Sequence, residues 1–460
     1  CLFPVLIDQL NTHWPMKVKL LLRNPQDYLR ETADDIHKLA RNPAPELHPM
    51  SAETEYVRAL NAAKLERMFA KPFLGCFGDQ GDQLSRVCMH PRALSLCLSG
   101  CVDGRVAFWN IPRRSRVLQL DAHSGCVQGL CWHPEQDLFY SCCDTDRTLK
   151  AWRVGDDLTE FSRPVSQRHL DFAPLNLDHH VSKDLFALSG DAVYLYDSRR
   201  SDPVGQWKWG SDSVLQARFN PTEWHLLAAV TKDNALLLID TRQREPLRRI
   251  RCEFRQNALC WNPQEPFVLA TASDDYNLYS WDARRLASPA CVYRGHTNAA
   301  MDVDFAPTGR ELVSASYDCT VRLWESGRSQ SRDVYHTKRM YRVFAARYSL
   351  DARFIVTASA DFNLRLWKAR ASEKLGALTP RERAAVNTAE ALKQKYAHHP
   401  QVRRIVQHRH LPKRLYQAQL EMKAIRGKQR RKEVNRREHR GEDKEPFVPE
   451  RDRHVRGVDE

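Results

Sequence analysis

The sequence predicts an all-β fold, a seven-bladed propeller, from one repeated motif and its period. A strand-like run ends on an aromatic or aliphatic residue seven times, with gaps of 42 to 44 residues. In six copies an aspartate stands six residues earlier. A unit of this size cannot bury its own apolar face, so it must stack on its neighbours. The run ends are Trp109, Trp152, Tyr196, Ile239, Trp281, Trp324 and Trp367, and the aspartates are Asp103, Asp146, Asp233, Asp275, Asp318 and Asp361.

The spacing also predicts where each motif lies in its blade. The aspartate belongs to a turn between two strands, and the run after it alternates between the two faces of the sheet. The third copy departs from the pattern, with Gly190 at the aspartate position and Asp191 one place later. Residues 168–197 are therefore the weakest of the seven units.

Residues 314–324 read Ser-Ala-Ser-Tyr-Asp-Cys-Thr-Val-Arg-Leu-Trp, and residues 359–367 repeat the pattern. These stretches resemble the WD40 family, and the resemblance implies a WD40 propeller. Two copies also have the histidine of that family, His123 and His296. The resemblance implies that each histidine bonds the turn aspartate of its blade. A catalytic His–Asp pair is the alternative, but a repeated motif favours a structural role.

Five segments are expected along the chain. Residues 1–15 are a gene-prediction artefact or a disordered lead, residues 16–71 an N-terminal arm, and residues 72–368 the propeller. Residues 369–440 form a basic helical domain, and residues 441–460 a disordered acidic tail. We expect residues 72–77 to pair beside the strand that ends at Trp367, which would close the ring and remove two exposed edges.

The N-terminal arm is expected to be mostly extended, with a short helix at residues 27–39 and a longer one at residues 52–69. No apolar run approaches the ~18 residues that cross a membrane. The apolar patch in residues 2–7 lacks a basic leader, so it is a poor secretory signal. We therefore expect no membrane partner.

The 13 cysteines include no Cys-x-x-Cys pair, which predicts reduced thiols and no metal centre. The run Asp178-His179-His180 is the one metal candidate that we weighed. Neighbouring residues of a strand point to opposite faces, so the two histidines are poorly placed to share an ion.

The positive charge is concentrated in the tail. Residues 369–440 contain 20 Lys and Arg against 6 Glu, a net charge of +14, whereas residues 441–460 carry −3 and residues 1–368 carry +3. A basic tail on a nearly neutral scaffold indicates a polyanionic partner, and RNA is the commonest one inside cells.

Three helices are predicted in the basic domain. Thr379 and Glu382 form a capping box with Pro380 between them, so a helix begins there and extends to about residue 396. A second short helix covers residues 401–410, and a third begins near Lys413. Beyond Gly427 the third helix has almost no apolar face. It must either fray in water or lie on a charged partner.

The tail resembles the Sof-type domain of a family of small-subunit ribosome-biogenesis factors. The resemblance rests on residues 371–376, 408–413 and 430–436, with support from residues 59–67 and 334–340. It implies a nucleolar component of the small-subunit processome, associated with the U3 small nucleolar ribonucleoprotein and needed for 18S rRNA maturation. The expected partners are pre-rRNA, that ribonucleoprotein and other processome proteins.

The basic side chains of the tail are the candidate RNA or partner contacts, since Lys and Arg neutralise phosphate without reading sequence. The alternative is a solvated charged helix with a nuclear import signal at residues 428–432. The candidates are Arg403, Arg404, Arg409, Lys413, Arg414, Lys428, Arg430, Arg431, Lys432, Arg436 and Arg437.

A second motif, a hydrophobic residue followed by Asp-x-Arg, occurs at residues 196–199, 239–242 and 281–284. It resembles the box by which WD40 substrate receptors dock on the adaptor of cullin-4 ubiquitin ligases, a role also described for the Sof-type family. The alternative is an arginine that pairs with its own aspartate or stays solvated. The candidate adaptor contacts are Arg199, Arg242, Asp282 and Arg284.

No Gly-rich phosphate loop, acid–nucleophile pair or metal-ligand spacing is visible in the sequence. We therefore expect a non-catalytic scaffold without a cofactor or small-molecule substrate. Its RNA contacts are expected to be directed at the backbone, because no base-reading motif is present.

Overall fold

The computed structural model describes residues 50–78, 80–154, 163–210, 212–439 and 447–459. The chain consists of two compact units, residues 1–59 and residues 60–460. Residues 1–15 and the helix expected at residues 27–39 lie outside the described residues. The predicted longer helix of the arm is present as α2 (Ser51–Met68).

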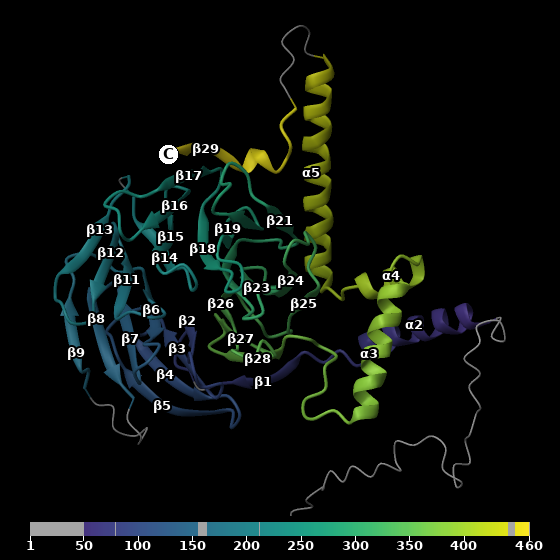
Figure 1. Ribbon diagram of the computed structural model, residues 1–460, viewed down its shortest axis with the longest axis horizontal. Helices are drawn as coiled ribbons and strands as arrows, with labels where there is room; N and C mark the ends of the chain where they lie inside the picture. Colours follow the sequence, from purple (N-terminus) through teal and green to yellow (C-terminus); the bar gives the residue numbers. More distant parts are fainter. Residues whose placement is uncertain (1–49, 79, 155–162, 211, 440–446, 460) are drawn as a thin grey trace, which may run out of the picture. The chain divides into compact units, whose positions relative to one another are not determined.

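Seven antiparallel sheets confirm the predicted propeller (Figure 1). We number the blades 1 to 7 along the chain and call the strands of each blade a to d, from the first to the last in the sheet. Blade 1 consists of β2 (Leu84–Met89), β3 (Leu96–Cys101), β4 (Arg105–Asn110) and β5 (Ser115–Asp121). Blade 2 consists of β6 (Val127–Trp132), β7 (Leu138–Cys143), β8 (Thr148–Arg153) and β9 (Ser166–His169). Blade 3 consists of β10 (Asn176–His179), β11 (Leu185–Ser189), β12 (Val193–Asp197) and β13 (Pro203–Trp207).

Blades 4 to 6 follow the same order. Blade 4 consists of β14 (Val214–Phe219), β15 (Leu226–Thr231), β16 (Ala235–Asp240) and β17 (Arg248–Cys252). Blade 5 consists of β18 (Gln256–Trp261), β19 (Val268–Ser273), β20 (Asn277–Asp282) and β21 (Cys291–Arg294). Blade 6 consists of β22 (Ala300–Phe305), β23 (Glu311–Ser316), β24 (Val321–Glu325) and β25 (Asp333–Tyr335).

Blade 7 closes the ring as the sequence predicts. Its strands β26 (Val343–Tyr348), β27 (Phe354–Ser359) and β28 (Leu364–Lys368) come from the end of the propeller, and β1 (Phe73–Phe77) supplies the fourth. β1 pairs antiparallel to β28, with Phe73 opposite Trp367. The pairing joins the two ends of the repeat and gives the outer edge of β28 a partner.

Blade 4 has a fifth strand that the sequence analysis missed. β29 (Val455–Asp459) pairs antiparallel to β17, so the expectation of disorder for residues 441–460 is wrong for residues 455–459. Val455 and Val458 pack against the buried cluster that blades 4 and 5 share. Acidic composition suggested disorder, whereas two valines and an open sheet edge are sufficient for a strand.

Within the blades, each tryptophan of the motif is tied to the preceding strand b. The Nε1 of Trp324 donates to Ser314 Oγ at 2.9 Å, and the Nε1 of Trp367 donates to Thr357 Oγ1 at 2.9 Å. Trp109, Trp152 and Trp281 make the same bond. The bond is therefore kept in blades 1, 5 and 7, where the sequence has no histidine for it.

The expected histidine contacts are present in blades 2 and 6. His296 lies with Nδ1 2.9 Å from Asp318 and Nε2 2.7 Å from Ser314, and both side chains of the His–Asp pair are buried. His123 lies 3.5 Å from Asp146 and 2.8 Å from Ser141. These bonds bring the d–a loop to the b–c turn, so both lie on one face of the ring. We call it the b–c face, and the opposite face, which carries the a–b and c–d connections, the c–d face.

The basic domain contains α3 (Pro380–Lys395), α4 (Pro400–Gln407) and α5 (Lys413–His439). The capping box is confirmed: Thr379 accepts from the Glu382 amide, and the Glu382 side chain accepts from the Thr379 amide. A short 3-10 helix, η3 (Asp452–His454), precedes β29. Among the described helices, none is both long and apolar enough to cross a bilayer.

Candidate nucleic-acid interface

Helix α5 contacts the propeller through its first half, and in its second half Glu433 accepts from Arg453 of η3. Leu415 is its one buried side chain among the described residues. Gln419 donates to the Gly295 carbonyl at 2.9 Å, and Arg426 donates to Asn277 Oδ1 at 3.2 Å. Gly295 belongs to a d–a loop and Asn277 follows a b–c turn. The base of α5 therefore lies on the b–c face, across blades 5 and 6.

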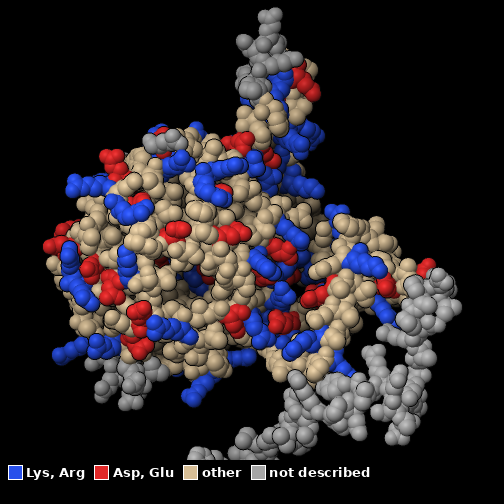
Figure 2. Space-filling view, viewed as in Figure 1, with Lys and Arg blue, Asp and Glu red and all other residues tan. Residues whose placement is uncertain are grey.

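The second half of α5 carries a dense set of cations. Lysines and arginines are visible along the helix in Figure 2. From Gly427 to the helix end there are six Lys and Arg against two Glu. The 3.6-residue period distributes such a run around the whole circumference. The described part of the helix thus offers charge in several directions rather than one face for a protein groove.

The structure places most of the predicted contact residues on exposed surface. Arg403 and Arg404 lie on α4, Arg409 lies in the connection between α4 and α5, and the others lie on α5. Arg437 is half-buried, with its guanidinium 4.9 Å from the centre of the Phe447 ring. The exposed members are Arg403, Arg404, Lys413, Arg414, Lys428, Arg430, Arg431, Lys432 and Arg436.

Arg409 has a different setting from the one that the sequence pattern suggested. Its side chain is only 17% exposed and lies 3.9 Å from Asp333, which also accepts a bond from Arg67 at 3.1 Å. Burial, followed by the neighbouring Arg67, lowers the pKa of Arg409 to about 10. This arginine ties the tail to blade 6, so we remove it from the RNA candidates.

The last turns of α2 help to hold the tail. Arg67 donates to the Val406 carbonyl at 2.5 Å, and Lys393 of α3 lies 2.7 Å from Glu66. On α4, Val402 is buried. Arg67 and Val406, like Glu66 and Lys393, lie more than 300 positions apart in the chain. No short-range pattern could have predicted the contact, although the resemblance at residues 59–67 marks the segment.

The three hydrophobic-Asp-x-Arg boxes share one local geometry at the c–d corners of blades 3, 4 and 5. In each, the arginine amide donates to the box aspartate, at 3.0 Å for Arg199, 2.9 Å for Arg242 and 3.0 Å for Arg284. This bond is an Asx turn, which fixes the corner.

The arginine side chains of these boxes differ. The guanidinium groups of Arg242 and Arg284 pair with their own aspartates through two nitrogens, at distances between 2.7 and 3.2 Å. These hydrogen bonds lower the pKa values of Asp240 and Asp282. The Arg199 side chain is 85% exposed and lies 4.0 Å from Asp184. All three remain open to solvent on the c–d face.

Charged groups on the innermost strands surround the propeller channel, the place where some propellers hold ligands. Asp178 and Arg218 lie 2.9 Å apart on blades 3 and 4. Arg347 lies 3.2 Å from Asp302 and 3.7 Å from Asp304, on blades 7 and 6. Burial lowers the pKa of Arg347, but the two carboxylates outweigh it and leave that pKa raised.

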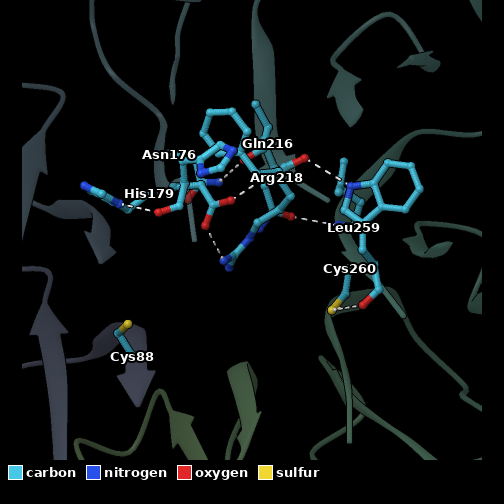
Figure 3. A network of polar contacts seen from close by, with 12 residues as sticks. Cys88, Asn176, His179, Gln216, Arg218, Leu259 and Cys260 are labelled. Carbon is cyan, nitrogen blue, oxygen red and sulfur yellow. Dashed lines mark hydrogen bonds and ion pairs between the residues drawn. The ribbon is translucent and has the colours of Figure 1, made fainter. Parts of the chain in front are cut away.

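Figure 3 shows that this network joins neighbouring blades. The Gln216 side chain accepts from the Leu259 amide at 2.8 Å, and the Arg218 carbonyl accepts from Trp261 Nε1 at 3.1 Å. The Cys260 thiol points toward Asp304 at 3.4 Å. The described charges are thus used to tie one blade to the next, which is a structural role.

Metal binding has little support among the described residues. In the run that we weighed from the sequence, Asp178 pairs with Arg218, while His180 accepts from the Ser182 and Lys183 amides. The ligand atoms of His123, Cys143 and Asp146 do lie within 4.8 Å of one another. However, that histidine already bonds Ser141, and the cluster coincides with the His–Asp pair that builds blade 2.

Two family profiles match the chain. The Sof1-like domain covers residues 369–455, and the WD domain, G-beta repeat, covers residues 114–153, 287–325 and 332–368. With the seven-bladed ring and the basic helices, these matches define a WD40 propeller protein with a Sof1-like domain.

Full-length relatives narrow this class to one family. The DDB1- and CUL4-associated factor 13 of Xenopus laevis is 44% identical over 96% of this chain and all of its own length, and that of Homo sapiens is 42% identical with the same coverage. Protein SOF1 of Saccharomyces cerevisiae is 36% identical over 96% of this chain and 95% of its own length. The chain belongs to the family of these proteins, as the resemblance implied.

Proposed function

We propose that the protein is a non-catalytic assembly factor of the small-subunit processome. It supports pre-18S rRNA processing together with the U3 small nucleolar ribonucleoprotein, in the nucleolus. Membership in a family that includes Protein SOF1 and the Sof1-like domain supports this assignment. The propeller is the rigid platform, and the basic helices provide the contacts to RNA.

The observation that carries the proposal is the cationic second half of α5. The one buried side chain described on α5, Leu415, lies in its first half, so packing on the propeller does not explain the cations of the second half. Phosphate neutralisation by Lys and Arg releases counterions and supplies affinity that is independent of sequence. Arginine also presents two parallel donors to a phosphate group. A helix with such groups on several sides fits between RNA strands.

The test is charge reversal of five cations in the second half of α5: Arg430, Arg431, Lys432, Arg436 and Arg437, each to Glu. We expect the variant to enter the nucleus, through an added import signal, but to lose co-sedimentation with pre-ribosomal particles. Unchanged co-sedimentation would refute the proposal.

A matched control makes the same change of net charge on the propeller. Arg113, Arg116, Arg153, Lys208 and Arg244 are exposed and lie outside the tail, so replacing them with Glu should leave co-sedimentation intact. Equal loss in both variants would show a general charge effect and would also contradict the proposal.

A second candidate function is substrate reception for a cullin-4 RING ubiquitin ligase. The name of the vertebrate relatives states an association with DDB1 and CUL4. In this chain, the specific support is the repeated corner of blades 3 to 5, where Asp240 and Asp282 hold arginines in a fixed orientation at the surface. A pre-oriented guanidinium loses less conformational freedom when it binds a carboxylate or carbonyl.

Replacement of Arg242 and Arg284 with Glu should abolish capture of purified DDB1. Arg328 is the matched control: it lies at the corresponding corner of blade 6, is 75% exposed and pairs with Glu325. Arg328→Glu should leave capture unchanged. Retained capture by the double variant would remove this candidate.

A further inference from the structure

The residue after the motif aspartate has a left-handed backbone in six blades. The φ angles are 87° at Gly104, 50° at Arg147, 63° at Asn234, 72° at Tyr276, 64° at Cys319 and 64° at Phe362. Glycine and asparagine suit this conformation, whereas a bulky aromatic side chain is rarely found in it. Blades 5 and 7 nevertheless have aromatic residues there, so the fold does not explain the choice.

The b–c face, which carries these turns, also has exposed aromatic side chains. Tyr341 is 66% exposed, Phe254 is 45% exposed and Phe362 is 43% exposed. Tyr341 and Phe254 lie in d–a loops, and Phe362 in a b–c turn. The Ala360 amide donates to the Arg342 carbonyl at 2.8 Å, which holds the loop of Tyr341 against the turn of Phe362.

Arginines accompany these rings. The Arg342 guanidinium lies 5.3 Å from the centre of the Tyr317 ring, and that ring meets Phe344 edge-to-face at 5.7 Å. Arg255 also acts on Tyr317: burial raises the pKa of this tyrosine, while Arg342 and Arg255 lower it. The Arg255 Nε is buried without a hydrogen-bond partner among the described atoms.

The rings and the base of α5 lie on the same face, because Gln419 of α5 donates to the Gly295 carbonyl in a d–a loop at 2.9 Å. Burial raises the pKa of the Cys319 thiol, and Arg414 at the start of α5 and Arg342 lower it in part. Exposed rings, cations and the basic helix thus share one side of the propeller. We use the name aromatic rim for Phe254, Arg255, Tyr317, Tyr341, Arg342 and Phe362.

We propose that the aromatic rim binds single-stranded RNA by stacking unpaired bases on its exposed rings, with Arg255 and Arg342 on the neighbouring phosphates. Flat rings beside cations match the two chemical parts of an unpaired nucleotide, whereas a duplex hides its bases. The inference rests on the proposed role in pre-rRNA processing. It adds a second contact between the protein and the RNA, made to the bases, whereas the cations of α5 contact only the phosphates.

The test measures fluorescence anisotropy of a labelled, unstructured 20-nucleotide RNA and of a duplex of equal length with the full chain. Tyr341→Ser and Phe362→Asn should each weaken single-strand binding about tenfold, the value of one stacked base. Duplex binding should be unchanged. Phe362→Asn should keep or raise the unfolding temperature, since asparagine accepts the left-handed turn; a ring needed for packing would lower it.

Trp224→Ala is the matched control. Trp224 is 41% exposed, has the Lys183 ammonium 3.2 Å from its ring centre, and lies in an a–b loop on the opposite face. Its loss should not affect RNA binding. Unchanged single-strand affinity in both rim variants would overturn the inference, as would equal losses for single strand and duplex. Loss of a protein partner with RNA affinity intact would also overturn it.

The tail variant with five glutamates separates this inference from the proposed function. If that variant still joins pre-ribosomal particles while the rim variants lose single-stranded RNA, the role of the tail is contradicted and the rim inference stands.

Discussion

The Nδ1 atom of His454 lies 3.0 Å from the Tyr279 hydroxyl, which itself donates to Asp275. Asp275 is the motif aspartate of blade 5, a blade without the histidine that blades 2 and 6 place beside theirs. A histidine from the C-terminal segment thus occupies the neighbourhood of that aspartate. Together with β29, it fastens the end of the chain to blades 4 and 5.

Removing this attachment should expose the edge of blade 4. Val458→Asp places a charge against the apolar cluster of blades 4 and 5, so β29 should detach. We expect faster hydrogen exchange in β17 with the rest of the propeller unchanged. The control is Arg456→Asp, at an exposed position of the same strand, which should preserve protection. Unchanged exchange in the valine variant would contradict the attachment.

Closure by β1 should contribute strongly to stability. Phe77 is 2% exposed and packs edge-to-face on Trp109, with ring centres 5.5 Å apart. Phe77→Ala should lower the free energy of unfolding by about 3–5 kcal/mol through lost burial and the cavity it leaves. Chemical denaturation measures this value. Cys76, on the same strand but exposed, provides the control Cys76→Ser, which should have little effect.

Acid should destabilise the propeller through its buried histidines. Burial is the largest cause that lowers the pKa of His123 and of His179 to about 4. Below about pH 6.5 these two histidines become protonated in the unfolded chain, whereas they stay neutral in the folded chain down to about pH 4. Stability is therefore complete above that pH and falls toward pH 4, by about 1.4 kcal/mol per pH unit for each histidine.

His179→Phe tests the acid effect at one site. His179 packs on the Tyr140 ring, and the corresponding strand-a position in other blades holds aromatic residues such as Phe219, so phenylalanine fits. The variant should lose less stability than the unchanged protein between pH 6.5 and 4.5. Thermal unfolding across this range measures the difference, and identical pH profiles would contradict the assignment.

The sequence predicted those parts of the structure that depend on local repetition. The period of the tryptophans and aspartates predicted the blades, and the capping box at Thr379 predicted the start of α3. Contacts between distant segments were less accessible. β29 was missed because its partner, β17, lies about 200 residues earlier. The burial of Arg409 was missed because the acid it approaches, Asp333, belongs to blade 6.

For the candidate sites, composition located the basic helix but not its surroundings. The charge run beyond Gly427 predicted a helix with almost no apolar face, and Leu415, the one buried side chain described on α5, lies before that run. It could not show that Gln419 and Arg426 fix the base of the helix to the b–c face. Nor could it show that the arginine boxes lie on the c–d face. The two proposed activities therefore use opposite faces of the ring, a relationship that only the folded chain reveals.

Salt dependence should distinguish phosphate contacts from stacking. For single strands, the slope of log K against log salt is about −0.7 for each phosphate neutralised. The variant with five glutamates in α5 should therefore have a slope smaller in magnitude by about 3.5 than the unchanged chain, if each cation meets one phosphate. Tyr341→Ser should weaken binding with the slope unchanged. Parallel slopes for the tail variant and the unchanged chain would contradict phosphate contact by α5.

Crosslinking to RNA in cells, with mapping of the crosslinked peptides, tests the central claim most directly. The account predicts crosslinks to pre-18S rRNA or to the U3 RNA in peptides from α5, above all from residues 428–437. Crosslinks confined to other segments, with α5 free of RNA in purified pre-ribosomal particles, would contradict it.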